Sequence, residues 1–131
     1  KQVDVRNLFE GQIVKVDDRY QLHWQGVILE LGQRDDVDHM QNISWAISPE
    51  KVILHQRVRP SRGEQENPVS GQIIDMLTLR GITTVLVALT VANNIVIQMD
   101  VSKHVAERNS LEKGQDITMS IIASAIHIMK E

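Results

Sequence analysis

One short sequence pattern occurs twice in this chain. The segment from Asn7 to Val14 reads Asn-Leu-Phe-Glu-Gly-Gln-Ile-Val, and the segment from Asn67 to Ile74 reads Asn-Pro-Val-Ser-Gly-Gln-Ile-Ile. The two copies also end alike, because residues 47–54 and 121–128 carry apolar residues at matching positions. An internal repeat of this size predicts two copies of one small β unit. Neither copy contains a catalytic constellation, so the function is expected to lie in what such a pair binds or regulates.

The composition sets the class of protein. The chain has 131 residues, of which 42% are apolar and 24% charged, enough for one domain or two very small ones with a modest core. Aromatic residues make up 3% and the net charge is −3, which disfavours a nucleic-acid partner. The absence of cysteine excludes a disulfide framework and thiolate metal sites. The longest apolar runs are far too short to cross a membrane. The chain starts at Lys1, close to the first repeat, and we expect it to be a piece of a longer protein.

Alternation of apolar and polar residues dominates both copies and predicts strands with one buried face. In the second copy the alternation runs from Val85 to Val91 and from Ile95 to Met99, with a hairpin turn at Asn93-Asn94, because asparagine tolerates positive φ. In the first copy, strands are predicted over 13–16, 20–24 and 27–31, with turns at 17–19 and 25–26. The predicted fold is therefore all-β.

The second copy is longer than the first. Its repeat glycine lies 50 positions before its closing segment, against 36 in the first copy, a difference of 14. Part of this extra length is predicted to form a short helix near residues 102–109, with Ser102 as the N-cap. Residues 57–66 carry mixed charge without apolar periodicity, which indicates a linker. The predicted organisation is a first, shorter unit over 1–56, the linker over 57–66 and a second unit over 67–131.

Each candidate for chemistry has a simpler interpretation. Residues 35–39 hold three aspartates and a histidine, but the glycine and distal glutamate of a calcium loop are missing, so a solvated loop is favoured. The five histidines show no zinc spacing. A phosphate-binding Gly-x-x-x-x-Gly-Lys-Ser/Thr loop and a Ser/His/Asp or Cys/His arrangement are also missing. We predict no catalytic residue, no metal site, and neither binding nor hydrolysis of ATP by this chain.

A longer series of motifs then carries a family resemblance. The second copy has the Asn-x-x-x-Gly opening, a long hairpin, the helix start Val101-Ser102-Lys103-His104, the turn Leu111-Glu112-Lys113-Gly114 and the closing strand Ile121-Ile122-Ala123-Ser124. With these motifs it resembles a molybdate-binding Mop domain. The first copy resembles a shorter module of the same kind, and its residues 47–54 are similar to the Arg-Pro-Glu-x-Val/Ile strand of the tandem TOBE region that ends many ABC importer ATPases. The resemblance covers nearly the whole chain and implies two tandem small OB-like five-stranded β-barrels with one short helix.

The resemblance also implies a function. It suggests the C-terminal regulatory and dimerising TOBE domain of the ATP-binding subunit of an ABC importer of the molybdate, tungstate or related oxyanion class. ATP and Mg would belong to the nucleotide-binding domain, so no cofactor is expected in this chain. The implied partners are a second copy in a homodimer, that nucleotide-binding domain, a membrane permease and a small oxyanion. The implied location is cytoplasmic, at the inner face of the cell membrane through the transporter complex.

An oxyanion site needs N–H groups, hydroxyls and a cation that converge, because a dianion is costly to desolvate without charge-assisted donors. The family draws on a Ser-x-Arg-Asn opening, a serine or threonine at the helix start and a Lys-Ser/Thr pair on the last strand. The donors that remain at these places are Arg6, Asn7, Ser102, Lys103 and Ser124. Ile122 and Ala123 replace the lysine and the serine, and Glu64 and Glu66 enter the second opening. We expect a degenerate or altered site, with any bound anion beside Ser102 at the helix N-terminus.

Two other functions stay open. The first is a free-standing molybdate or tungstate storage protein, which would hold the oxyanion when purified. The second is an OB-fold module of a sugar-type ABC importer ATPase. An OB-fold module that binds oligosaccharide or nucleic acid is a further possibility, which the scarcity of aromatic residues and the negative net charge disfavour. The transported cargo and the oligomer size are not determined by the sequence.

Overall fold

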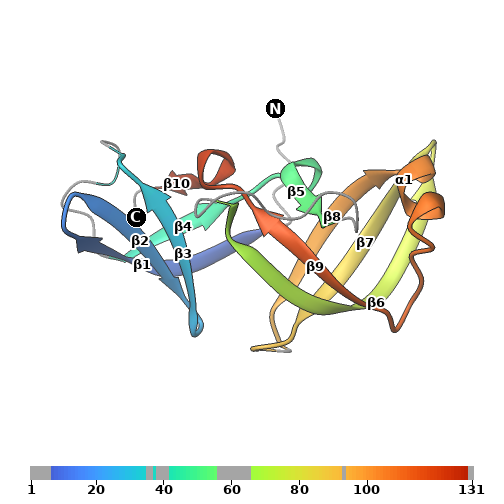
Figure 1. The fold of residues 1–131 in the computed structure, drawn as a ribbon, viewed down its shortest axis with the longest axis horizontal. Coiled ribbons are helices and arrows are strands. Elements are labelled where there is room, and N and C mark those ends of the chain that lie inside the picture. Colours follow the sequence, from blue (N-terminus) through green and yellow to red (C-terminus); the bar gives the residue numbers. More distant parts are fainter. Residues whose placement is uncertain (1–6, 35–36, 38–41, 56–65, 93, 130–131) are drawn as a thin grey trace.

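The chain forms two curved five-stranded antiparallel sheets that lie side by side (Figure 1). The computed structural model describes residues 7–34, 37, 42–55, 66–92 and 94–129. In chain order the elements are β1 (Leu8–Val16), β2 (Arg19–Trp24), β3 (Val27–Gly32), β4 (Asn42–Ala46), the 3-10 helix η1 (Pro49–Lys51), β5 (Val52–Leu54), β6 (Pro68–Leu79), β7 (Ile82–Leu89), β8 (Val96–Ser102), α1 (Lys103–Arg108), β9 (Asp116–Ile121), the 3-10 helix η3 (Ala123–Ala125) and β10 (His127–Met129). The predicted all-β class with one short α-helix is confirmed.

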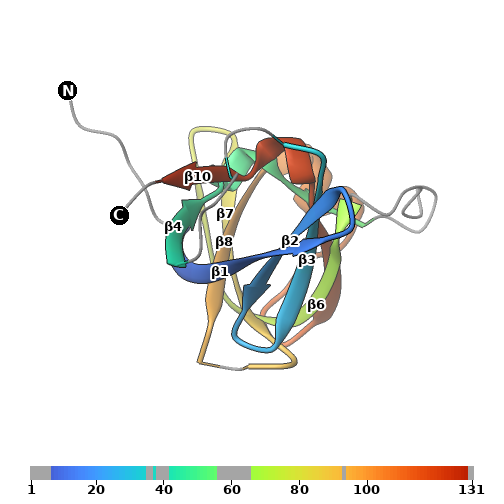
Figure 2. The ribbon, with the colours of Figure 1, turned by 90° about the vertical axis from the view of Figure 1, so that its left-hand side faces the viewer.

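The two halves of the chain exchange their closing strands. The strand order is β10-β4-β1-β2-β3 in the first sheet and β5-β9-β6-β7-β8 in the second. The strand that ends the first repeat, β5, thus pairs with β9, with Val52 opposite Ile121. The strand that ends the second, β10, pairs with β4, beside which it lies in Figure 2. The units 1–56 and 67–131 stay a prediction as domains, but each sheet takes one strand from the other half.

The asparagine that opens each repeat is buried and binds the opposite sheet. Asn7 donates from Nδ2 to the Gln98 carbonyl and accepts at Oδ1 from the Gln98 N–H, both at 2.8 Å. Asn67 accepts from the Glu30 N–H at 2.7 Å and donates to the carbonyls of Glu30 and Ile121, both at 3.0 Å. Each side-chain amide therefore hydrogen-bonds to the N–H and C=O of one residue at the outer edge of β8 or β3, as a neighbouring strand would. We call these two contacts the asparagine clamps.

The repeated glycine marks the point where a strand changes neighbour. β1 pairs with β4 over 8–12 and with β2 over 12–16, and β6 pairs with β9 over 68–72 and with β7 over 71–79. A Cβ on Gly11 would meet the Leu22 side chain, and a Cβ on Gly71 would overlap the Ala88 carbonyl. The repeat keeps glycine because the crossing strand leaves no room for a side chain.

Two-residue turns join the hairpins. Gln25 and Gly26 have φ of 51° and 84°, and Arg80 and Gly81 have φ of 54° and 81°, as type I′ turns require. The pairings β1–β2 and β2–β3 confirm the predicted turns of the first copy. β7 and β8 pair as predicted, and Asn93 of the turn between them lies outside the described residues.

The buried apolar residues form one hydrophobic cluster, whose composition differs between the two sheets. Phe9, Trp24 and Trp45 form a cluster in the first sheet, with ring centroids 4.7 to 5.1 Å apart. All four aromatic residues of the chain precede residue 46. The core of the second sheet is aliphatic, with Val87 and Met99 among its fully buried side chains. Tryptophan fluorescence therefore reports on packing at the first sheet.

We expect Asn7→Ala to lower the free energy of unfolding by about 2–4 kcal/mol, because the buried Gln98 peptide groups lose their partner. The control is Asn42→Ala, since the Asn42 amide is exposed and contacts Gln12 at 3.3 Å, and its effect should stay within about 0.5 kcal/mol. Urea denaturation followed by circular dichroism and tryptophan fluorescence measures both. Equal effects would contradict the structural role of the clamp.

Alanine at the two repeat glycines should destabilise to different extents. Gly71→Ala is expected to cost about 3 kcal/mol, because its Cβ meets a backbone carbonyl that cannot move aside. Gly11→Ala should cost about 1–2 kcal/mol, because the nearest atom is the end of the Leu22 side chain, at 2.7 Å. Thermal and urea unfolding of both variants checks the order, and a larger effect at Gly11 would contradict it.

Candidate functional site

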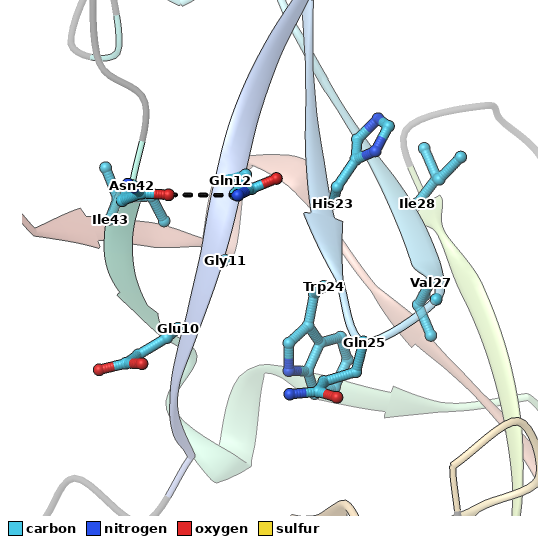
Figure 3. Close-up of a pocket in the computed structure, with 11 residues that line it drawn as sticks. Glu10, Gly11, Gln12, His23, Trp24, Gln25, Val27, Ile28, Asn42 and Ile43 are labelled. Carbon is cyan, nitrogen blue, oxygen red and sulfur yellow. Dashed lines mark hydrogen bonds between the residues drawn. The ribbon is translucent and has the colours of Figure 1, made fainter.

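A concavity of about 660 Å³ lies on the first sheet, lined by residues of β1 to β4 and of the turn between β2 and β3 (Figure 3). The backbone at Gly11 forms part of its wall, where β1 leaves β4 and turns towards β2. Gln12 and Asn42 lie towards one end, and Glu10 and Gln25 towards the other (Figure 3). The bend of β1 at the repeat glycine therefore shapes this groove.

Strand register places polar side chains in one row along the groove. Gln12 lies opposite Asn42 on β4 and opposite His23 on β2, so the three side chains share a face of the sheet. Gln12 donates to the Asn42 side-chain oxygen at 3.3 Å. The row continues beyond the groove, because His23 Nε2 lies 3.2 Å from Gln21 Oε1 and Gln21 donates to Glu30 at 2.7 Å.

The groove suits an uncharged polar ligand better than an anion. Its hydrogen-bonding side chains are the amides of Gln12, Gln25 and Asn42, together with Glu10 and His23. Among the described residues that line it there is no lysine or arginine, so these residues do not supply the fixed positive charge that a desolvated dianion needs. The sequence analysis did not identify this groove. The period-two pattern could have placed Gln12 and His23 on outer faces, but their meeting depends on register.

The predicted oxyanion donors lie in separate parts of the structure. Arg6 lies outside the described residues, and Asn7 is buried with its side chain bound to Gln98. Ser102 and Lys103 begin α1, whereas Ser124 is exposed in η3, which packs against β3 of the first sheet. Figure 1 shows α1 at the far end of the second sheet, well away from β3. The assignment of these five residues to an oxyanion stays a prediction.

Backbone N–H groups at the start of α1 are already hydrogen-bonded within the protein. Ser102 is the N-cap, as predicted, and its Oγ accepts from the Val105 N–H at 3.1 Å. The Lys103 N–H donates to the Gly81 carbonyl at 2.9 Å. The helix has six residues, so its dipole is small. The structure thus gives Ser102 a capping role that does not depend on a ligand.

Two further predictions concern metals and membranes. The acidic cluster at 35–39 falls mainly outside the described residues, as does the linker predicted over 57–66, of which Glu66 alone is described. Within the described ranges, no group of three histidine, aspartate or glutamate side chains could hold a metal ion. In the same part of the chain, no helix has the length and apolar character needed to span a membrane.

Comparison with known proteins establishes the fold. No protein-family model and no curated protein matches the sequence. Among solved structures, the chain is similar to the cytoplasmic molybdate-binding protein ModG in a crystal form with molybdate bound. The TM-score is 0.75, the match covers 98% of each chain, and the sequence identity is 16%. The predicted fold, a tandem pair of small OB-like barrels, is confirmed by this similarity.

We expect Ser102→Ala to lower stability by about 1 kcal/mol in the absence of any anion, because the Val105 N–H loses its acceptor. Ser102→Asp should keep most of the stability, because aspartate caps as well as serine. The control Ser124→Ala removes an exposed hydroxyl that caps nothing in η3, and should change stability by less than about 0.5 kcal/mol. Identical unfolding curves for Ser102→Ala and the parent chain would contradict the capping role.

Proposed function

We propose that this chain is a TOBE/Mop-type regulatory and dimerisation module of the ATP-binding subunit of an ABC importer, of the molybdate, tungstate or related oxyanion class, with an altered oxyanion site. Its fold supports this proposal. The similarity to ModG extends over 98% of both chains, so it includes both sheets of this chain rather than one small barrel. Because the identity is 16%, the ligand has to be argued from the residues of this chain.

Those residues favour a weak oxyanion site. Ile122 and Ala123 stand at the positions where the related sites carry lysine and serine, and Ala123 is buried. Asn7 makes two hydrogen bonds to Gln98 that a ligand would have to replace. Glu66 adds a carboxylate just before the second repeat. A dianion would therefore find fewer charge-assisted donors than it needs to offset its desolvation.

The remaining parts of the proposal concern the partners of the module, its location and its self-association. The chain acts without catalysis, as a partner of a nucleotide-binding domain that binds ATP and Mg and of a membrane permease. It works in the cytoplasm at the inner face of the membrane, and it associates with a second copy of itself. The open sheet edges of so small a fold support self-association.

The alternative of a free-standing molybdate or tungstate protein has one observation in its favour. ModG is matched over 98% of its own length, so a protein with these two sheets and little else can bind molybdate. A second alternative, a module of a sugar-type importer, is favoured by the groove on the first sheet, whose described lining residues offer amides and include no lysine or arginine. Submicromolar oxyanion affinity would favour the first alternative over the leading proposal, whereas weak oxyanion binding is compatible with both the leading proposal and the second alternative.

We expect molybdate, tungstate and sulfate to produce no thermal shift that corresponds to submicromolar affinity. Loss of one buried charge-assisted contact costs roughly 2–5 kcal/mol, on the order of a thirty-fold loss of affinity or more. The double variant Ile122→Lys/Ala123→Ser should therefore bind molybdate at least about thirty-fold more tightly than the parent chain.

The control for added charge is Ile53→Lys, which places a lysine on an exposed position of β5 and should leave molybdate affinity unchanged. Differential scanning fluorimetry and isothermal titration calorimetry measure all three chains. Submicromolar binding by the parent chain would overturn the altered-site proposal and favour the storage protein. Binding by the parent that is lost in Ser102→Ala would identify the helix start as the site.

A further inference from the structure

The second half of β6 has a long open edge. β9 covers this edge only over 68–72, and the peptide groups of Ile73 are bound by the Gln115 carbonyl at 2.9 Å and the Gly114 N–H at 2.7 Å. After a bulge, β6 continues with β7 as its one described neighbour. This end of β6, yellow-green in Figure 1, lies at the extremity of the molecule near α1. Residues 74–79 therefore lack a described strand on one side.

The hairpin turn determines which peptide groups face this edge. Leu79 and Ile82 flank a two-residue turn, so they form the pair that exchanges both of its hydrogen bonds. Peptide direction alternates along a strand, so Thr78, and Met76 two residues earlier, direct their N–H and C=O groups away from β7. The Met76 N–H donates to the Asp75 carboxylate at 2.9 Å, which satisfies one of these groups locally.

Large apolar side chains are exposed along the same edge. Leu77 is 60% exposed and Leu79 64%, and Ile82, which faces Leu79 across the hairpin, is 46% exposed. The three share the outer face of the second sheet. Natural edges are usually protected by charged residues, proline or a bulge; Asp75 and the bulge lie at the start of this segment, and residues 76–79 contain no charged residue and no proline. An open edge with exposed leucines is the pattern of a strand that pairs with another chain.

The other long sheet edges are better protected. The outer edge of β3 is bound by Asn67, and the outer edge of β8 by Asn7. The remaining edge strands, β5 and β10, have three residues each. Among the described strands, β6 thus has the longest edge combined with exposed leucines.

We infer that this edge of β6 pairs antiparallel with the same edge of a second copy, about a two-fold axis that passes through Thr78. An antiparallel edge is complementary to itself, because each copy offers the other the same alternation of donors and acceptors. With the axis at Thr78, the two Thr78 peptides exchange hydrogen bonds. Leu77 then lies opposite Leu79 of the second copy, so four leucines meet on one face. No charged residue lies between Met76 and Leu79 to oppose this contact.

This inference rests on the proposed function only through self-association, and it identifies the surface that carries it. A monomeric parent chain at all concentrations would overturn both. If the chain dimerises but substitutions in β6 leave its dissociation constant unchanged, the β6 surface alone is overturned. Neither result depends on oxyanion binding.

Sedimentation velocity over a wide concentration range tests the surface. Leu77→Glu/Leu79→Glu should raise the dimer dissociation constant at least about a hundredfold, because four buried leucines become four carboxylates that repel one another. Thr78→Pro should do the same, because it removes an N–H that faces away from β7. It also removes the Thr78 hydroxyl, which lies 2.7 Å from the hydroxyl of the buried Thr83, so its folding has to be checked. The control Ile53→Glu changes an isoleucine that is 50% exposed on β5, and should leave the dissociation constant unchanged. Circular dichroism establishes that each variant is folded.

A cross-link gives a second readout, because the chain has no cysteine of its own. Thr78→Cys should form a disulfide-linked dimer under mild oxidation, since the two Thr78 positions lie opposite each other in the proposed pairing. Ile28→Cys, an exposed position on β3, should stay monomeric on a non-reducing gel. Cross-linking through Ile28 but not through Thr78, or an unchanged dimer in Thr78→Pro, would overturn the inference.

Discussion

Reciprocal exchange of closing strands makes each half of this chain incomplete without the other. β5 completes the second sheet and β10 completes the first, while the asparagine clamps occupy the outer peptide edges of β8 and β3. None of these contacts can form within one half. If the halves separated, each sheet would lose a strand and would expose buried peptide groups at the same time. The two sheets are therefore expected to unfold as one cooperative unit, although the repeat has two copies.

The two halves differ in how far the central strand extends beyond its short neighbour. β9 has six residues and lies along the beginning of the twelve-residue β6, so the rest of β6 extends beyond it with β7 alone. The extra residues of the second copy supply this longer hairpin, the helix α1 and the turn that binds Ile73. In the first half, β1 extends past the last residue of its pairing with β4 by only four residues, 13–16. Lengthening one copy of the repeat thus created the one long open edge with exposed leucines among the described strands.

Local features of the fold could be predicted from the sequence, and long-range pairing could not. The hairpins of the first copy and the Ser102 cap follow from alternation, turn residues and helix-capping preference, all within a few residues. The exchange could not be predicted in this way, because β5 and β10 have three residues each and nothing within them distinguishes their own sheet from the other. The groove could not be predicted from the sequence for a related reason. Gln12, His23 and Asn42 come from three strands, and only the register brings them into one row.

The repeated motif carries less information about the ligand than about the architecture. Its asparagine binds a peptide group of the opposite sheet, and its glycine is required where a strand changes neighbour. A chain can therefore keep Asn-x-x-x-Gly and the tandem fold whatever it binds. The residues free to define a ligand are those that the architecture does not use, such as Lys103 and Ser124 around α1 and η3 and the polar row of the groove. A fold similar to that of a molybdate-binding protein is thus compatible with weak molybdate binding, because the fold and the ligand site depend on different residues.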